Sequence, residues 1–380
     1  MKLFRCLLTV LTAIITLMGC QTTESAEEYY LFVGTYTQES SEGIYLYKFD
    51  AGDGSLDSLG TTTGVKNPSY LAFSPDHKNV YAVNEMADSA RATVSAFSFD
   101  KKNNSLTFLN KQSSGGGAPC YISVDKTGQY AFVGNYVGGS LSVLPINSDG
   151  SLAPSQQTIQ HQGSSVNKKR QQQPHVHCTL PTPDNDALVV TDLGTDYVKR
   201  YSFDANSGRL NPDPVSTYKA KAGAGPRHIT FGPSADYAYL IEEMSGSVVA
   251  FKNQADTLKP IQRTSALPKD YGDAISGADI HVSSDGKYLY ASMREDLNQI
   301  VIFEIDQENG KLSLAGRQPT GGEHPRNFMV DPTGGYLLAA NRDTDNVVVF
   351  ERDQSTGKLT ATGTELNISM PVCLKMMPME

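Results

Sequence analysis

One short motif recurs seven times along the 380-residue chain, about every 50 residues, and it limits the possible folds more than any other feature. Each copy opens with a four-residue anchor, which usually contains a proline, and continues with a short apolar segment. The anchors lie at 67–70, 118–121, 174–177, 225–228, 278–281, 324–327 and 370–373. A period of this length indicates a repeat architecture in which each copy is one supersecondary unit.

Each copy predicts a small antiparallel sheet. The turn segments, such as 74–79 and 283–288, are rich in Asp, Pro, Ser and Gly, which favour tight hairpins. The segments that follow the turns are rich in aromatic and β-branched residues, and no long stretch has helical periodicity. The chain is therefore expected to be all-β, with four strands in each unit.

The two ends of the chain predict how the units close. Residues 30–56 contain only the later strands of a unit, and the last anchor, at Pro371, supplies only its beginning. Six internal units and one shared unit give seven blades in a ring, which removes open sheet edges. A solenoid, the rival architecture, would need capping ends. We therefore predict a seven-bladed β-propeller over residues 29–380.

The N-terminus has the pattern of an export signal. Residues 1–19 begin with two positive charges and continue with an apolar run that is too short to span a bilayer comfortably. Gly19 before Cys20 resembles the lipobox of bacterial lipoproteins. We predict a signal peptide over 1–19, a lipid on Cys20 as the only membrane attachment, and a polar tether over 20–28. This places the protein in the cell envelope, at the outer membrane or in the periplasm, or in the cytoplasm if the leader is not used.

Charge and cysteine content exclude some partners. The formal net charge of −9 argues against a nucleic-acid partner. Cys120, Cys178 and Cys373 lie in or beside repeat anchors and are expected to be buried free thiols. The sequence gives no indication of the oligomeric state.

Ionisable side chains gather in three consecutive units, between residues 174 and 294. The loops at one mouth of a propeller bring residues from every blade to a common point. A histidine beside a carboxylate can activate water, and paired arginines can hold a phosphate or carboxylate. This predicts hydrolysis of an anionic ester. The residues concerned are His175, His177, Arg227, His228, Glu243, His281 and Arg294, with Arg326 and Arg342 on equivalent loops further along. Substrate binding is the role predicted for five of them, His175, His228, His281, Arg326 and Arg342.

A structural interpretation competes with the functional one. Buried histidines and arginines at anchor positions can serve only to hydrogen-bond neighbouring loops. Asp192, Asp196 and Glu85 are expected to be turn and cap residues. The polar segment 161–173, which contains three consecutive basic residues at 168–170, is expected to be a flexible, solvated insert, with a basic lip on the channel as the alternative.

The sequence resembles the propeller-type 6-phosphogluconolactonase (lactonase) family over nearly the whole chain after the leader. The resemblance implies opening or closing of a lactone with an anionic substituent, with no cofactor. The family's relatives include fungal muconate lactonising enzymes, whose proposed active residues, carried over by motif, fall on His177, Arg227, Glu243 and Arg294. The motifs are QQPHVHCTLPTPD, VTDLGTDYVKRY, GAGPRHITFGPSADYAYLIEE, GADIHVSSDGKYLYASMRE and GGEHPRNFMVDPTGGYLLAANRDTDNVVVF.

These observations lead to one main hypothesis and two alternatives. The main hypothesis is hydrolysis of 6-phospho-D-glucono-1,5-lactone. Arg227 and Arg294 clamp the anionic group and polarise the carbonyl, while His177, oriented by Glu243, deprotonates water. The first alternative is an envelope lactonase for another carboxylated or unphosphorylated lactone, and the second is a non-catalytic surface propeller that binds a glycan or protein. A Ca²⁺-dependent gluconolactonase fits poorly, because one Glu among Arg and His is a poor site for a hard cation.

Overall fold

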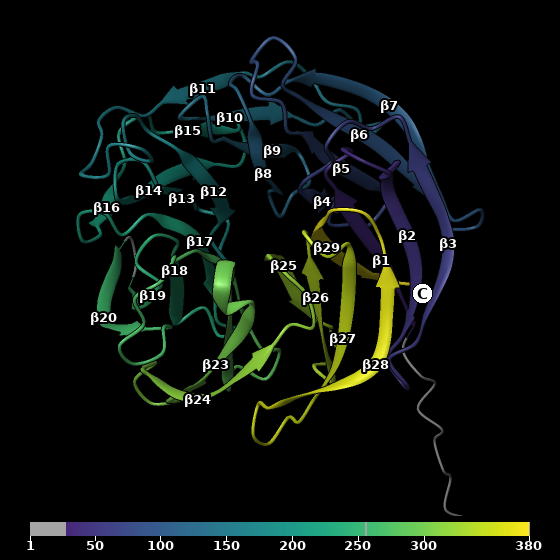
Figure 1. Cartoon of the computed structure of the whole chain (residues 1–380). Coiled ribbons are helices and arrows are strands. Elements are labelled where there is room, and N and C mark those ends of the chain that lie inside the picture. The colour runs from purple at the N-terminus through teal and green to yellow at the C-terminus, as the bar shows by residue number, and fades with distance from the viewer. Residues whose placement is uncertain (1–27, 255–256, 380) are drawn as a thin grey trace, which may run out of the picture.

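The computed structural model describes residues 28–254 and 257–379, and these form seven separate antiparallel sheets arranged around a common axis (Figure 1). The prediction of an all-β, seven-bladed propeller is confirmed. No helix among the described residues is long and apolar enough to cross a membrane. The signal peptide and Cys20 lie outside the described residues.

The first three blades follow one another along the chain, each beginning with its innermost strand. In blade 3 both short outer strands, β15 and β16, pair with β14. Blade 1 contains β4 (Leu71–Phe73), β5 (Asn79–Asn84), β6 (Thr93–Asp100) and β7 (Ser105–Ser113). Blade 2 contains β8 (Pro119–Val124), β9 (Tyr130–Asn135), β10 (Ser140–Pro145) and β11 (Gln157–Gln160). Blade 3 contains β12 (Val176–Pro181), β13 (Ala187–Asp192), β14 (Tyr197–Asp204), β15 (Arg209–Leu210) and β16 (Ser216–Lys219).

The next three blades have four strands each. The described helical structure is a single 3₁₀ turn, η1 (Glu295–Leu297), in blade 5. Blade 4 contains β17 (Pro226–Phe231), β18 (Tyr237–Glu242), β19 (Ser247–Gln254) and β20 (Thr257–Ser265). Blade 5 contains β21 (Gly277–Val282), β22 (Tyr288–Met293), β23 (Gln299–Ile305) and β24 (Leu312–Pro319). Blade 6 contains β25 (Pro325–Val330), β26 (Tyr336–Asn341), β27 (Asn346–Arg352) and β28 (Leu359–Asn367).

Blade 7 is shared between the two ends of the chain, as predicted. Its strand order is β29 (Pro371–Pro378), β1 (Glu28–Thr35), β2 (Gly43–Asp50) and β3 (Leu56–Thr63). In the pairing of β29 with β1, Gly34 lies opposite Cys373. A Cβ on Gly34 would lie 2.4 Å from the Pro68 carbonyl oxygen, so only glycine lets blade 1 pack this closely. Cys373, like Cys120 and Cys178, is a buried free thiol, which confirms the prediction.

Two kinds of hydrogen bond join neighbouring blades. Tyrosines on second strands donate to backbone carbonyls of the next blade; for example, the Tyr290 hydroxyl lies 2.8 Å from the Gly357 oxygen. Three outer-strand amides each hold one leucine of the next blade, accepting from its N–H and donating to its carbonyl. These amide clamps are Asn110–Leu152, Gln157–Leu210 and Gln262–Leu312.

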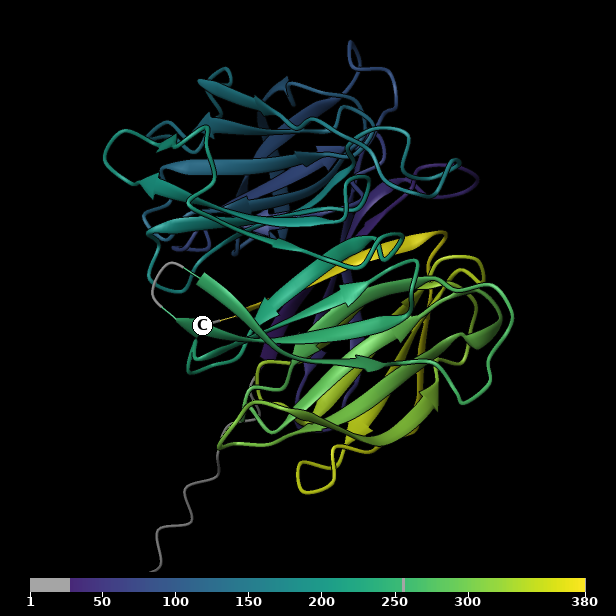
Figure 2. The same cartoon turned by 90° about the vertical axis from the view of Figure 1, so that its left-hand side faces the viewer.

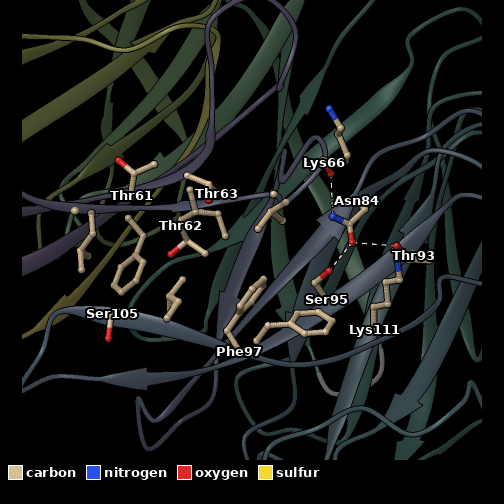
Figure 3. Close-up of a pocket in the computed structure, with 18 of the residues that line it drawn as sticks. Thr61, Thr62, Thr63, Lys66, Asn84, Thr93, Ser95, Phe97, Ser105 and Lys111 are labelled. Carbon is tan, nitrogen blue, oxygen red and sulfur yellow. Dashed lines mark hydrogen bonds between the residues drawn. The ribbon is translucent and has the colours of Figure 1, made fainter.

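Among the residues that the structure describes, no such clamp joins blades 7 and 1, and a groove opens between them (Figure 3). In β3, Gly60 occupies the register position that Gln262 has in β20, next to the same strand irregularity. The groove has a volume of about 1050 Å³ and is lined by Phe97 and Phe108. Its polar wall centres on Asn84, with Lys66, Thr93 and Lys111 gathered beside it.

We expect the clamps to contribute to stability. Gln262→Ala removes both hydrogen bonds to Leu312, whose N–H and carbonyl then lose their partner, so the free energy of unfolding should fall by about 1–3 kcal/mol. Differential scanning calorimetry measures the change. The control is Gln318→Ala, which removes an exposed hydrogen bond to the adjacent Pro319 carbonyl. Equal thermal midpoints for the two variants would contradict the role given to the clamp.

Candidate active site

One backbone hydrogen bond repeats in all seven blades and places the side chains at one mouth of the propeller. The N–H of the residue that follows each second strand donates to the carbonyl just before the start of the innermost strand, at 2.7–3.1 Å. In Figure 2, seen from the side, the strands run between the two faces of the ring, so these residues share one face. This set, called the loop ring, is Tyr36, Glu85, Tyr136, Leu193, Glu243, Arg294 and Arg342.

The innermost strands carry two further rings of side chains around the channel. Each described innermost strand except β4 has a register irregularity at its start, and such bulges re-aim side chains. The residues at the irregularity form the bulge ring, and the residues after them form the second ring. The bulge ring is Ser69, Cys120, His177, Arg227, Ala278, Arg326 and Val372. The second ring is Tyr70, Tyr121, Cys178, His228, Asp279, Asn327 and Cys373.

The rings correct the repeat alignment made from the sequence. The anchors at 174–177 and 278–281 were aligned by their histidines, but His177 is equivalent to Arg227, and Asp279 to His228. The irregularities hide the true register, because they shift the anchor relative to the strand that follows. The signal that would have set it is the first apolar residue after the bulge, Ile229 in one unit and Ile280 in the other, because these two residues are equivalent although Ile280 lies inside its anchor.

Glu243 is the centre of charge at this mouth. Its side chain is buried, and Oε1 accepts a hydrogen bond of 2.6 Å from Arg170 Nη2. Oε2 lies 2.5 Å from Arg227 Nη1 and 3.2 Å from Arg294 Nη2. Burial alone would raise the pKa of this carboxyl, but the charges of Arg294, Arg227 and Arg170 hold it well below its ordinary value. Glu243 is therefore ionised and fixes three guanidinium groups.

Backbone carbonyl groups hold Arg227 and Arg294, the two arginines that are predicted to bind the anionic group of the substrate. Arg227 Nε donates to the Ala278 carbonyl at 3.0 Å, and Arg294 Nη2 donates to the Gly277 carbonyl at 3.0 Å. Arg294 Nε is buried and has no hydrogen-bond partner among the described residues. Burial and the neighbouring Arg227 charge lower the pKa of Arg294 to about 9, so an arriving anion would favour its charged form. The pair is held rigidly and retains N–H groups for a ligand.

The segment 161–173 is largely exposed, as predicted, but it is held by hydrogen bonds rather than being a flexible insert, and the contact of Arg170 with Glu243 fits the alternative of a basic lip on the channel. His161 is buried, with Nδ1 2.8 Å from Asp192 Oδ2, and Gln171 Nε2 donates to Asp196 Oδ1 at 2.8 Å. Buried carboxylates need partners, and the polar residues of the insert supply them. The insert is thereby ordered, and it carries Arg170 to Glu243.

The three predicted turn and cap carboxylates behave differently. Asp192 Oδ1 accepts from the backbone N–H groups of His175 and Gly194, which confirms its capping role. Asp196 accepts hydrogen bonds from the N–H groups of two glycines in the loop before β17. It also accepts from Gln171 of the segment 161–173. Glu85 is neither a turn nor a cap residue, because its Oε2 accepts from the Tyr36 hydroxyl at 3.0 Å within the loop ring.

His177, rather than His175, faces the centre. His175 stacks on Tyr136, with ring centroids 4.3 Å apart, and its Nδ1 is bonded to the Tyr136 carbonyl oxygen. His177 is 3% exposed and lines a small cavity between the bulge ring and the second ring. Burial, followed by the charge of Arg227, holds the pKa of His177 well below its ordinary value, so the ring is neutral. The predicted orientation by Glu243 is wrong, because both oxygens of Glu243 are taken by arginines.

The second ring contains a buried pair that the sequence did not reveal. His228 Nδ1 lies 2.7 Å from Asp279 Oδ1, and His281 Nε2 lies 2.9 Å from Asp279 Oδ2. Asn327 Nδ2 also donates to Oδ2. Burial would raise the pKa of Asp279, but His281 and His228 hold it well below its ordinary value. Asp279 therefore orients two predicted substrate-binding histidines.

The two remaining predicted arginines differ in their surroundings. Arg326 has no hydrogen-bond or ion-pair partner among the described residues, and its guanidinium lies 5.5 Å from the centre of the Tyr36 ring. It lines the same cavity as His177 and Arg227. Arg342 is tied to Asp343 at the rim, with Nε 2.5 Å from Oδ1. Arg326 is thus the free guanidinium of the group.

Comparisons with known proteins agree on one family. The family model described as "Lactonase, 7-bladed beta-propeller" matches residues 30–376. The 6-phosphogluconolactonase of Bacillus subtilis is 37% identical over 92% of this chain and 99% of its own. A crystal structure of a putative 6-phosphogluconolactonase from Bacteroides fragilis has a TM-score of 0.88 and 42% identity, covering 94% of this chain and 99% of that one. The periplasmic gluconolactonase of Pseudomonas aeruginosa has a TM-score of 0.87 and 34% identity, covering 92% and 99%.

The buried Glu243 predicts a pH-dependent loss of stability. Glu243→Gln leaves three guanidinium groups around a neutral side chain and should lower the free energy of unfolding by about 3–5 kcal/mol at pH 7. Because the folded-state pKa of Glu243 is depressed, its contribution is present above the unfolded value of about 4.3 and is lost as the pH falls towards the folded value.

The difference between the parent and Glu243→Gln in urea unfolding should therefore shrink below about pH 4. The control is Glu304→Gln, at an exposed position of β23. A gap that is constant from pH 7 to pH 3 would argue against the ion-pair cluster.

Proposed function

The chain belongs to the seven-bladed β-propeller lactonase family, and from this premise we propose that it hydrolyses a sugar lactone with an anionic substituent, foremost 6-phospho-D-glucono-1,5-lactone. Support for the substrate comes from relatives at 36–37% identity that are named 6-phosphogluconolactonase. Membership of the family also favours an enzyme over the alternative of a non-catalytic binding propeller.

The observation that carries the proposal is the concentration of positive charge at one mouth of an acidic protein. Three arginines surround the single carboxylate of Glu243, and Arg326 adds a fourth positive charge with no partner of its own among the described residues. Guanidinium groups bind phosphate and carboxylate oxygens in a fixed, bidentate geometry. An anionic substrate offsets this charge, and a neutral one does not.

The proposed mechanism uses these groups without a metal. Arg326 binds the phosphate, while Arg227 and Arg294 donate to the lactone carbonyl oxygen and stabilise the oxyanion. Neutral His177 removes a proton from water as the water oxygen adds to the carbonyl carbon. The bond from the carbonyl carbon to the ring oxygen then breaks, and the ring oxygen takes up the proton. The substrate's negative charge also raises the pKa of His177, which the free site depresses.

We place the protein in the cell envelope, attached through a lipid on Cys20 after removal of residues 1–19. Support comes from the leader pattern and from the Pseudomonas aeruginosa relative, which is named a periplasmic gluconolactonase. That relative is called a gluconolactonase, which favours an unphosphorylated aldonolactone as the second candidate substrate.

Arg326 should distinguish the two substrates. Arg326→Met removes the unpaired guanidinium, and a hydrogen bond to a charged group contributes about 1.5–3 kcal/mol. We therefore expect kcat/KM for 6-phosphogluconolactone to fall about 10- to 100-fold, and that for glucono-δ-lactone to change less than about threefold.

The control is Arg209→Met, which removes an exposed arginine of β15. A loss of the same size on both lactones would mean that Arg326 does not bind the phosphate. Activity of the parent on glucono-δ-lactone alone would move the proposal to the unphosphorylated substrate.

His177→Gln should separate chemistry from binding. Loss of a general base lowers kcat about 10²- to 10⁴-fold, with KM close to that of the parent. The control is His77→Gln, in the turn between β4 and β5 at the opposite face. Parent-like turnover by His177→Gln, measured as acid release, would remove His177 from the mechanism.

A further inference from the structure

His228 of the second ring has one ring nitrogen that is bonded to Asp279 and one that has no hydrogen-bond partner among the described residues. Because Asp279 is ionised and accepts from His228 Nδ1, the proton of the neutral His228 ring is on Nδ1. The other nitrogen, Nε2, is buried and has no hydrogen-bond partner among the described residues. A buried nitrogen without a partner is costly, and Nε2 is an acceptor for a donor not supplied by the protein.

His177 contains a matching buried nitrogen. Its Nδ1 also has no hydrogen-bond partner among the described residues, and its ring centre lies 5.0 Å from that of His228 in an edge-to-face arrangement. Both residues line the same cavity, whose volume of about 10 Å³ is close to the space that one water molecule requires. Direct contact after a small ring rotation, or one bridging water, would link the two histidines.

We propose that His228 accepts the proton that His177 removes from the attacking water, and that Asp279 is the positioning residue that prepares His228 for this role. The proposal rests on lactone hydrolysis as the reaction. The water O–H bond breaks as its oxygen bonds to the carbonyl carbon, and the proton passes to His177 Nε2. His177 Nδ1 passes its own proton to His228 Nε2, and the reverse transfer later protonates the ring oxygen that leaves.

The charges around the two rings favour this direction. A positive charge on His177 would face Arg227, Arg294 and Arg326, and these arginines, after burial, hold its pKa down. A positive charge on His228 would lie against Asp279. Burial lowers the pKa of His228 to about 4, while Asp279 opposes the decrease. The other groups that face His228 are Arg227, His281, His177 and the phenols of Tyr70 and Tyr121.

A second buried histidine–aspartate pair provides the contrast. His161 Nδ1 is bonded to Asp192, and its Nε2 is bonded to the Tyr201 hydroxyl at 3.0 Å. Both ring nitrogens are therefore satisfied by the protein, as expected of a structural pair. His228 differs in having one nitrogen open to the channel cavity.

The test is Asp279→Asn in the full-length protein, assayed with 6-phosphogluconolactone. The amide keeps the size of the side chain and removes its charge. We expect kcat to fall at least about tenfold with KM within about twofold, and the acid limb of the kcat profile to move to lower pH, because a histidine without the carboxylate protonates less readily. The ¹⁵N NMR signals of His228, assigned with His228→Gln, should show loss of the fixed Nδ1–H form.

His228→Gln tests the same step from its other end and retains the carboxylate, so a folding defect in one variant leaves the other informative. The control, His77→Gln in the turn between β4 and β5 at the opposite face, should leave kcat and its pH profile as in the parent. If both channel variants keep the parent kcat and acid limb, the proton transfer to His228 is wrong while the function stands. If the parent hydrolyses no lactone, the proposed function itself fails.

Discussion

A single backbone hydrogen bond, repeated from the residue after each second strand to the start of each innermost strand, determines where the functional groups of this propeller lie. It holds Glu243 and Arg294 at one height on neighbouring blades, beside the strand irregularities that turn His177, Arg227 and Arg326 towards the axis. Closure of the ring is part of the same arrangement. The Leu374 N–H of the closing strand donates to Asn327 Oδ1, and Asn327 in turn donates to Asp279. Hydrogen bonds thus connect the strand that closes the ring to Asp279 and, through it, to His228 and His281.

Like charges assembled in a buried place are normally unfavourable, because desolvation and repulsion add. Here Glu243 offsets part of that cost for Arg170, Arg227 and Arg294. The remaining positive charge is held in position before a substrate arrives, so little reorganisation is needed on binding. The same field keeps His177 neutral in the free protein, and in the proposed mechanism a bound anion would raise its pKa again. In the proposed mechanism, this concentration of positive charge would both select an anionic substrate and activate the base.

The sequence predicted most of the fold and only part of the site, for identifiable reasons. Repeats of about 50 residues and the complementary ends predict the seven blades, because each unit must bury its faces against its neighbours. The cluster of His177, Arg227, Glu243 and Arg294 followed from equivalent positions in adjacent repeats. The contact of Arg170 with Glu243 was missed because the two residues are 73 positions apart in the sequence and Arg170 lies in a segment outside the repeat motif. Asp279 was missed because strand irregularities displaced the alignment. The groove beside Gly60 was missed because it forms between two blades, and the sequence of one repeat does not show how it packs against the next.

Both ends of the described chain lie on the face opposite the arginine cluster. β1 starts at Glu28 and runs towards Tyr36 at the mouth, while β29 starts near the mouth and ends at Pro378, and Tyr29 pairs with Pro378 there. A support joined to either terminus, whether a bilayer or a chromatography bead, would meet the far face of the ring. The mouth that holds the arginine cluster would then point into the surrounding solution. Immobilisation through a terminus should therefore leave the path of a dissolved sugar acid ester unobstructed.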